Sequence, residues 1–311
     1  MLAPIVLFVY NRPDHTQKVL DALKNNPEAK DSELFVYCDG AKENATDSEK
    51  EKIEETRQVI REILGFKRVS LIESQINKGL ANSIIEGVTE IVNKYGRIIV
   101  LEDDIATSSG FLKYMNDALE IYASTKKVMH ISGYVFPFQD TNKKYVFFSK
   151  PTSCWGWGTW KESWSFFEKN VDYQIEQIEK RNLWEKFTVN NTFPSYRDQL
   201  FQNKSGQIST WAIFWYASVF LKNGLSLHPS ISLTNNIGLD GSGEHCGDFK
   251  LEDNPYYNIE LADTIFVKKK YYFSSIKENK LLEKFYTEKI FNGKYLSTRD
   301  KLYLFRKKYL F

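Results

Sequence analysis

The chain has 311 residues, of which 42% are hydrophobic, 26% charged and 15% aromatic, and its net charge is +2. This length can bury a substantial core in one large domain, and the small net charge gives no reason to expect a polyanionic partner such as nucleic acid. Cys38, Cys154 and Cys246 stand far apart, which argues against a disulfide framework and favours a reducing compartment. We expect no signal peptide and no membrane span, because polar residues interrupt every apolar run well before ~20 residues.

Charge is distributed unevenly along the chain. Residues 264–311 hold 13 Lys/Arg and 4 Asp/Glu, so the body before them is acidic. We therefore expect a basic, aromatic C-terminal extension over residues 251–311, which follows a domain over residues 1–250. Two interpretations of the extension stay open: attachment to an anionic membrane surface, and a helix packed on the body or on another subunit. We expect a cytoplasmic protein, which the first interpretation would place at the inner face of the plasma membrane.

The first half of the chain alternates strand and helix patterns. Continuous apolar runs over residues 4–10, 34–38, 69–72 and 97–101 indicate buried strands, and a further strand is expected over residues 128–132. Apolar residues recur at helical spacing between them, and Thr46 with Glu49 has the spacing of a capping box. The repeated β-α-β order predicts an α/β fold with a mixed, mostly parallel, Rossmann-like sheet flanked by helices.

Three consecutive acids, Glu102-Asp103-Asp104 (the acidic cluster), follow the fourth of these strands. Neighbouring carboxylates repel one another unless a cation relieves them. Ligands of such sheets bind at the carboxyl ends of the strands, where Asn11, Arg12 and Asp39 also fall. Mn²⁺ or Mg²⁺, bridging a carboxylate and an anionic diphosphate, would suit this edge. The alternative is a solvated loop, or acids at the positive end of a helix.

Tryptophan and glycine are concentrated over residues 155–164. We expect Trp155 and Trp157 to form a platform for an acceptor sugar, because large aromatic faces stack on such rings. A cluster that lines the core is an equally weighted alternative.

The order of these motifs resembles that of the GT-A glycosyltransferases. The resemblance is strongest to the N-acetylglucosaminyltransferase I-like group and to bacterial family 2-type sugar transferases. It covers about residues 3–247, and the matching pieces are PIVLFVYNR, FVYCDG, RIIVLEDDIATSSGFLKYMNDAL, CWGWGTWKESW and GLSLHPSISLTNNIGLDGSGEH.

The resemblance implies a GT-A domain with a nucleotide half at about residues 1–133 and an acceptor half at about residues 134–250. It implies transfer of a sugar from a nucleoside diphosphate sugar to a hydroxyl of a glycan or lipid-linked saccharide, with inversion. The donor would be UDP-linked, with UDP-GlcNAc as one option. Asp104 would bind the metal, and the donor would be held by Asn11, Arg12, Asp39, Glu102, Asp103 and His245.

The sequence departs from the family where the general base is expected. The family has an acid just before a tryptophan in a segment similar to that at Trp211, but here residues 207–210 read QIST. We therefore expect the base to be Asp240 or Glu244, with Asp198 as a further candidate.

The spacing of the histidines does not indicate a metal or catalytic site. His245 adjoins Cys246, but no second pair at ligand spacing supports a zinc site. His15, His130 and His228 are expected to have structural roles.

Two other functions are kept as alternatives. A sugar-phosphate nucleotidyltransferase would need a Gly-rich basic loop after the first strand, where this chain reads YNRPDH. A catalytically impaired, glycan-binding protein remains open because the acid near Trp211 is missing.

Overall fold

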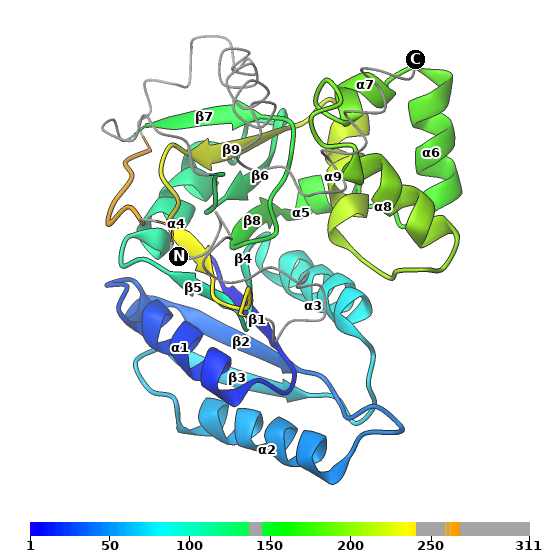
Figure 1. Ribbon diagram of the computed structural model, residues 1–311. Helices are drawn as coiled ribbons and strands as arrows, with labels where there is room; N and C mark the ends of the chain where they lie inside the picture. The colour runs from blue at the N-terminus through cyan, green and yellow to red at the C-terminus, as the bar shows by residue number, and fades with distance from the viewer. Residues whose placement is uncertain (137–144, 241–258, 260, 268–311) are drawn as a thin grey trace.

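The computed structural model describes residues 1–136, 145–240, 259 and 261–267, and it has an eight-stranded sheet with helices on both faces (Figure 1). The strand order is β3-β2-β1-β4-β8-β6-β9-β7, and all strands except β7 and β8 share one direction. The strands are β1 (Ile5–Val9), β2 (Glu33–Cys38), β3 (Arg68–Glu73), β4 (Arg97–Glu102), β6 (Val128–Ser132), β7 (Val146–Ser149), β8 (Trp157–Trp160) and β9 (Leu225–Pro229).

Two layers of helices bury the two faces of the sheet. One core cluster joins the sheet to α1 (Pro13–Lys24), α2 (Asp47–Glu62) and α4 (Phe111–Ile121). The other joins it to α3 (Leu80–Tyr95), α5 (Lys161–Trp164) and α9 (Ala212–Leu221). Because successive side chains of a strand point to opposite faces, Leu7 packs in the first cluster and Phe8 in the second. An unbroken apolar strand is therefore buried on both sides.

A group of helices lies beside the β6–β9 half of the sheet (Figure 1). It consists of α6 (Val171–Lys180), α7 (Trp184–Phe187), α8 (Ser195–Lys204) and α9, which share a third core. A short 3₁₀ helix (Ala29–Asp31) precedes β2, and a small ribbon pairs β5 (Ile105–Thr107) with β10 (Thr234–Asn236). Within the described part of the chain, no helix is both long enough and apolar enough to cross a bilayer.

The predicted fold class is confirmed: the sheet is mixed and mostly parallel, and helices flank it. Each of the five predicted strands lies within one residue of its predicted bounds at either end. The capping box is present, because Thr46 accepts from the Glu49 amide and Glu49 accepts from the Thr46 amide. These elements depend on short-range patterns that tertiary packing does not override.

The domain continues beyond the predicted boundary at residue 250. Ala262, Ile265 and Val267 are buried in the same cluster as α1 and α4, and the Ala262 amide donates to the Ser232 carbonyl at 2.8 Å. The packed domain therefore extends at least to Val267. Residues 137–144, 241–258, 260 and 268–311 lie outside the described residues. Predictions for Glu244, His245, Cys246 and the basic tail accordingly stay predictions.

Trp157 is a core side chain, so its predicted role as an acceptor platform is wrong. It lies on β8 with 0% exposure, and its ring stacks on Trp211 at 5.1 Å and on His130 at 5.5 Å. No face of this indole is left for a ligand, and the core-cluster alternative holds for it. Trp155 is only partly buried, with its ring 4.4 Å from Tyr134, and it stays a candidate.

Candidate active site

The site lies at the carboxyl ends of two adjacent parallel strands. β1 and β4 pair in parallel, with Phe8 opposite Glu102. Both strands are buried apolar runs, so their first polar residues emerge together at the edge of the sheet. This register places Arg12 beside the acidic cluster, although about 90 residues separate them along the chain.

One guanidinium serves two carboxylates at this edge. The Arg12 Nη2 group donates to Asp103 Oδ1 and, at 2.9 Å, to Asp104 Oδ2. The Asp103 side chain is 7% exposed, that of Asp104 16% and that of Arg12 19%, so the pairs are largely removed from water. Charge-assisted bonds in such surroundings are stronger than at the surface. The Arg12 Nη1 atom is buried and has no hydrogen-bond partner among the described residues.

Arg12 does not fully compensate the acidic cluster. Burial raises the pKa of Glu102 well above its usual range, and the charges of Asp104 and Asp103 raise it further. Burial also raises the pKa of Asp103, although Arg12 pulls it down. Burial opposes the charge on Arg12, but Asp103 and Asp104 more than offset this, so the pKa of Arg12 is raised. The charged forms of these carboxyls are therefore disfavoured in spite of Arg12, and a second cation at this edge would favour them.

The loop after β10 packs directly on Asp104. The antiparallel ribbon of β5 and β10 brings it there, and the Ile237 amide donates to the Asp104 carbonyl at 2.8 Å. A Cβ at Gly238 would lie 2.6 Å from Asp104 Oδ2 and 2.8 Å from Asp104 Cβ, so a larger residue there would displace the Asp104 side chain. Next to it, His15 Nε2 lies 3.1 Å from Asp240 Oδ2. The structure thus joins α1, the acidic cluster and the loop after β10.

Asp39 organises a neighbouring turn. Its carboxylate accepts the backbone amides of Gly40, Lys78 and Gly79, each at 2.9 Å. Lys78 and Gly79 lead into α3, so Asp39 holds the entry to this helix. Asn11 is half-buried at the end of β1, and its side chain forms no hydrogen bond with another described residue. The donor contacts predicted for both residues stay predictions.

The candidates for the general base have different positions. Asp240 lies in the loop beside the acidic cluster and pairs with His15. Asp198 is in the first turn of α8, and no hydrogen bond or ion pair within the described residues joins it to the acidic cluster. The segment before Trp211 supplies no acid, and Thr210 is tied there to Asn203. Asp240 is therefore the described candidate closest to the acidic cluster by its contacts.

The residues fit a divalent cation that is shared with a phosphate ligand. Within the described part of the chain, no three His, Cys, Asp or Glu side chains form a metal cage by themselves. The carboxylates are hard oxygen ligands, and Mg²⁺ is commonly held by one or two carboxylates together with phosphate oxygens. The unpartnered Arg12 Nη1 adds a donor at the same place. The donor set suits a metal with a diphosphate better than a metal alone.

Comparison with known proteins gives likeness in fold only. No protein-family model matches the chain, and no curated protein matches its sequence. Solved structures similar to it include S. aureus TarS, at 14% identity and a TM-score of 0.31, over 47% of this chain and 25% of that chain. Mouse xyloside xylosyltransferase 1 in its apo form has 8% identity and a TM-score of 0.38, over 71% and 81% of the two chains. A UDP-glucose pyrophosphorylase complexed with UDP-glucose has 11% identity and a TM-score of 0.37, over 76% and 94%.

This chain spans about a quarter of one S. aureus TarS chain and about half of a shorter one. One of these similar structures is a xyloside xylosyltransferase by its own description. The narrower N-acetylglucosaminyltransferase I-like grouping stays a prediction. At these identities and TM-scores, the site has to be judged from its own residues.

Some residues of the site gave little signal in the sequence. His15 was expected to be structural, but it contacts Asp240. Gly238 lies in the matching piece GLSLHPSISLTNNIGLDGSGEH, yet its close approach to Asp104 is visible only in three dimensions. Cys154 carries a thiol whose pKa is raised by burial and then by the charges of Glu102 and Asp104. Arg12 could be predicted from its place after a strand, whereas the contacts of these three depend on the paths of the segments that hold Cys154, Gly238 and Asp240.

Removing Arg12 should destabilise the protein more than removing a matched surface arginine. In Arg12→Met, two largely buried carboxylates lose their counter-charge, and we expect a loss of about 3 kcal/mol in the free energy of unfolding at neutral pH. Arg61 also bridges two acids, Glu54 and Glu73, but it is 41% exposed, so Arg61→Met should cost much less than Arg12→Met. Urea denaturation measures both, and equal losses would contradict the buried pairing.

Replacing Glu102 should stabilise the metal-free protein at neutral pH. A carboxyl whose pKa is raised by folding stabilises the folded state below its unfolded pKa, and this is lost as the pH rises through the folded pKa. Glu102→Gln carries no charge, so its advantage over wild type should grow with pH and vanish below about pH 4.

Thermal melts in a chelating buffer at acidic and neutral pH test this expectation. Glu120→Gln is the control, because Arg97 lowers the pKa of Glu120 and its replacement should not stabilise the protein. A Glu102→Gln variant that is no more stable than wild type at neutral pH would show that Glu102 bears no electrostatic cost.

Proposed function

We propose that this protein is a metal-dependent glycosyltransferase. It would move a sugar from a nucleoside diphosphate sugar, UDP-linked in the first instance and with UDP-GlcNAc as one option, to a hydroxyl of a glycan or lipid-linked saccharide, with inversion. The observation that carries this proposal is the acidic cluster at the end of β4. One arginine compensates it incompletely, and the site lies at the sheet edge where ligands of α/β folds bind.

The residues at this edge suit a nucleotide diphosphate. Asp104 would hold the cation, and Mn²⁺ or Mg²⁺ would supply charge stabilisation for the leaving diphosphate. Arg12 has one free amino group and two shared contacts, so it can turn toward phosphate oxygens while it stays near Asp103. Glu102 and Asp103 would contact the donor sugar and ribose. Asp39 would act through the turn that it holds, next to Asn11 at the strand end.

The general base would come from the segment that follows β10. Asp240 is our candidate among the described residues, because its loop packs on Asp104 and His15 fixes its carboxylate. A hydrogen bond from His15 would orient Asp240 toward an acceptor hydroxyl. Glu244 and His245, a few residues further along, stay candidates for the base and for closure over the donor. Trp155 is the remaining predicted acceptor contact.

The local structure argues against a sugar-phosphate nucleotidyltransferase. That activity would need a Gly-rich basic loop after the first strand. Here α1 begins at Pro13, only four residues after β1 ends at Val9. The one basic residue in this connection, Arg12, already contacts Asp103 and Asp104. No room for a phosphate-wrapping loop is left at this position.

Nucleotide binding should depend on both metal and Asp104. We expect one of UDP, GDP and dTDP, with UDP first, to bind in the presence of Mn²⁺. Asp104→Asn should weaken that binding by roughly tenfold or more, since a contact with a charged group is worth about 1.5–3 kcal/mol. Isothermal titration calorimetry with and without Mn²⁺ measures the affinities.

Asp117→Asn is the matched control, because Asp117 is a partly exposed acid of α4 that pairs with Lys113. Binding that is indifferent to Asp104, or no binding of any nucleotide, would contradict the proposal. The same samples can be tested for hydrolysis of the matching nucleotide sugar without acceptor. Tight binding without hydrolysis above the Asp104→Asn level would favour the impaired, glycan-binding alternative.

A further inference from the structure

Strand β3 forms one lateral edge of the sheet. It pairs in parallel with β2 and stands first in the strand order, so its outer side meets no strand within the described part of the chain (Figure 1). Every residue of β3 is exposed or half-buried, whereas β1, with a strand on either side, is buried throughout. The opposite edge strand, β7, is buried at three of its four residues. Of the two lateral edges, β3 is therefore the one that can accept a strand from another chain.

The middle of β3 lacks the devices that usually prevent such pairing. Free edges are commonly protected by charged side chains, proline or a β-bulge. Residues 69–72 read VSLI, with neither charge nor proline, and the register with β2 runs without a shift. Val69 and Leu71 pack on the core cluster of α1 and α2, which keeps the strand in place. The charged residues stand only at the two ends of the strand.

Exposed apolar side chains flank β3 on both sides. Leu64 is 79% exposed and Ile76 is 68% exposed, more than any other large hydrophobic residue of the described chain except the N-terminal one. The backbone at Ile76 is fixed, because its carbonyl accepts from the Ser74 hydroxyl at 2.6 Å. It also packs so closely on Gly40 that a Cβ there would lie 2.5 Å from the Ile76 carbonyl carbon. The side chain of Ile76 is therefore held outward by the fold itself.

The segment around β3 is complementary to itself about Ser70. Lys67 stands three residues before Ser70 and Glu73 three residues after it. Leu64 stands six residues before it and Ile76 six residues after it. Antiparallel pairing of two copies, with a two-fold axis at Ser70, would therefore bring Lys67 of each copy to Glu73 of the other. The same pairing brings the two exposed apolar side chains together at each end.

The charges favour this register. Lys67 is exposed and forms no ion pair with another described residue, while Glu73 is 28% exposed and binds Arg61 of its own chain at 2.7 Å. A second copy's Lys67 would extend that network with a further cation. No like charges would face each other across residues 66–74, since the residue that meets itself on the axis is the neutral Ser70. A shift by two residues in either direction loses both pairings.

We propose that two copies of this chain associate through β3, antiparallel and across a two-fold axis at Ser70, to form one continuous sheet. Such a contact is isologous, the commonest kind in homodimers. Antiparallel pairing turns the carboxyl ends of β1 and β4 in the two copies to opposite sides, so both acidic clusters stay open. The inference does not depend on the proposed transferase function. One strand pair with its flanks is a small interface, so we expect a dissociation constant in the micromolar range.

Sedimentation equilibrium of the full chain, over a series of micromolar concentrations, measures the association. Leu64→Ser and Ile76→Ser should each weaken the dimer by at least about tenfold, because each removes two symmetry-related apolar contacts. Phe166→Ser is the control, since Phe166 is 45% exposed and lies far from β3 along the sheet, after α5. It should leave the association unchanged. Thermal melts confirm that each variant is folded.

Lys67→Glu tests the charge pairing, because it would place two acids opposite each other at both ends of β3. We expect it to weaken the dimer at low salt, and we expect the loss to shrink at high salt, which screens exposed charges. A loss that does not change with salt would contradict the pairing of Lys67 with Glu73.

A cross-link tests the position of the axis. Directly opposite residues of an antiparallel pair have Cα atoms about 4.5–5.5 Å apart, which suits a disulfide. Mild oxidation of Ser70→Cys with copper phenanthroline should therefore give a covalent dimer that dithiothreitol reverses. Wild type and Ser48→Cys, which adds a cysteine at an exposed position of α2, should not give it.

Three results would overturn the proposal. One is a chain that stays monomeric throughout the concentration series. Another is a dimer that Leu64→Ser and Ile76→Ser do not weaken. The third is a Ser70→Cys variant that cross-links no better than Ser48→Cys.

Discussion

The structure around the site depends on three carboxylates that follow one buried strand. Burial and mutual repulsion disfavour the charged form of such a group unless positive charge lies beside it. Arg12 offsets part of the negative charge by pairing with Asp103 and Asp104. The pKa of Glu102 nevertheless stays well above its usual range. The cation that we propose for Asp104 would favour the charged forms of these carboxyls.

Neighbouring segments pack around the acidic cluster. The β5–β10 ribbon presses Gly238 on Asp104 and brings Asp240 to His15 at the start of α1.

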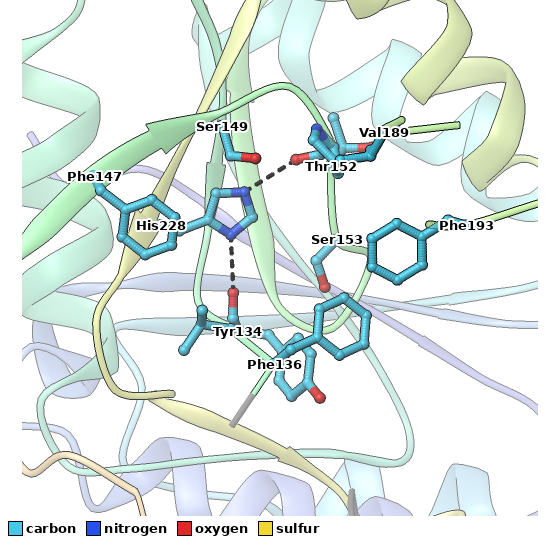
Figure 2. A pocket seen from close by; sticks show the side chains of 11 residues that line it. Tyr134, Phe136, Phe147, Ser149, Thr152, Ser153, Val189, Phe193 and His228 are labelled. Carbon is cyan, nitrogen blue, oxygen red and sulfur yellow. Dashed lines mark hydrogen bonds between the residues drawn. The ribbon is translucent and has the colours of Figure 1, made fainter. Parts of the chain in front are cut away.

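The sequence allowed the fold class and the position of the acidic cluster to be predicted, because both depend on local patterns. The β1 and β4 runs are apolar on both faces, and polar residues follow them directly. Trp157 was misjudged because a tryptophan in a glycine-rich segment looks the same whether it lines a core or a ligand. A charge shift near residue 250 does not reveal that Ala262 and Ile265 are buried in the core cluster of the sheet. The pocket lined by Phe136, Phe147 and Phe193 (Figure 2) could not be predicted from the sequence, because five separate segments form its walls.

The most direct test of the central claim is anomalous diffraction from crystals of the full chain soaked with UDP and Mn²⁺. The account predicts one anomalous peak within coordination distance of the Asp104 carboxylate and of the diphosphate, with Arg12 turned from Asp104 toward phosphate oxygens. A nucleotide bound away from the carboxyl ends of β1 and β4 would contradict it. So would a nucleotide at this edge with no metal on Asp104 and with Arg12 still bridging Asp103 and Asp104.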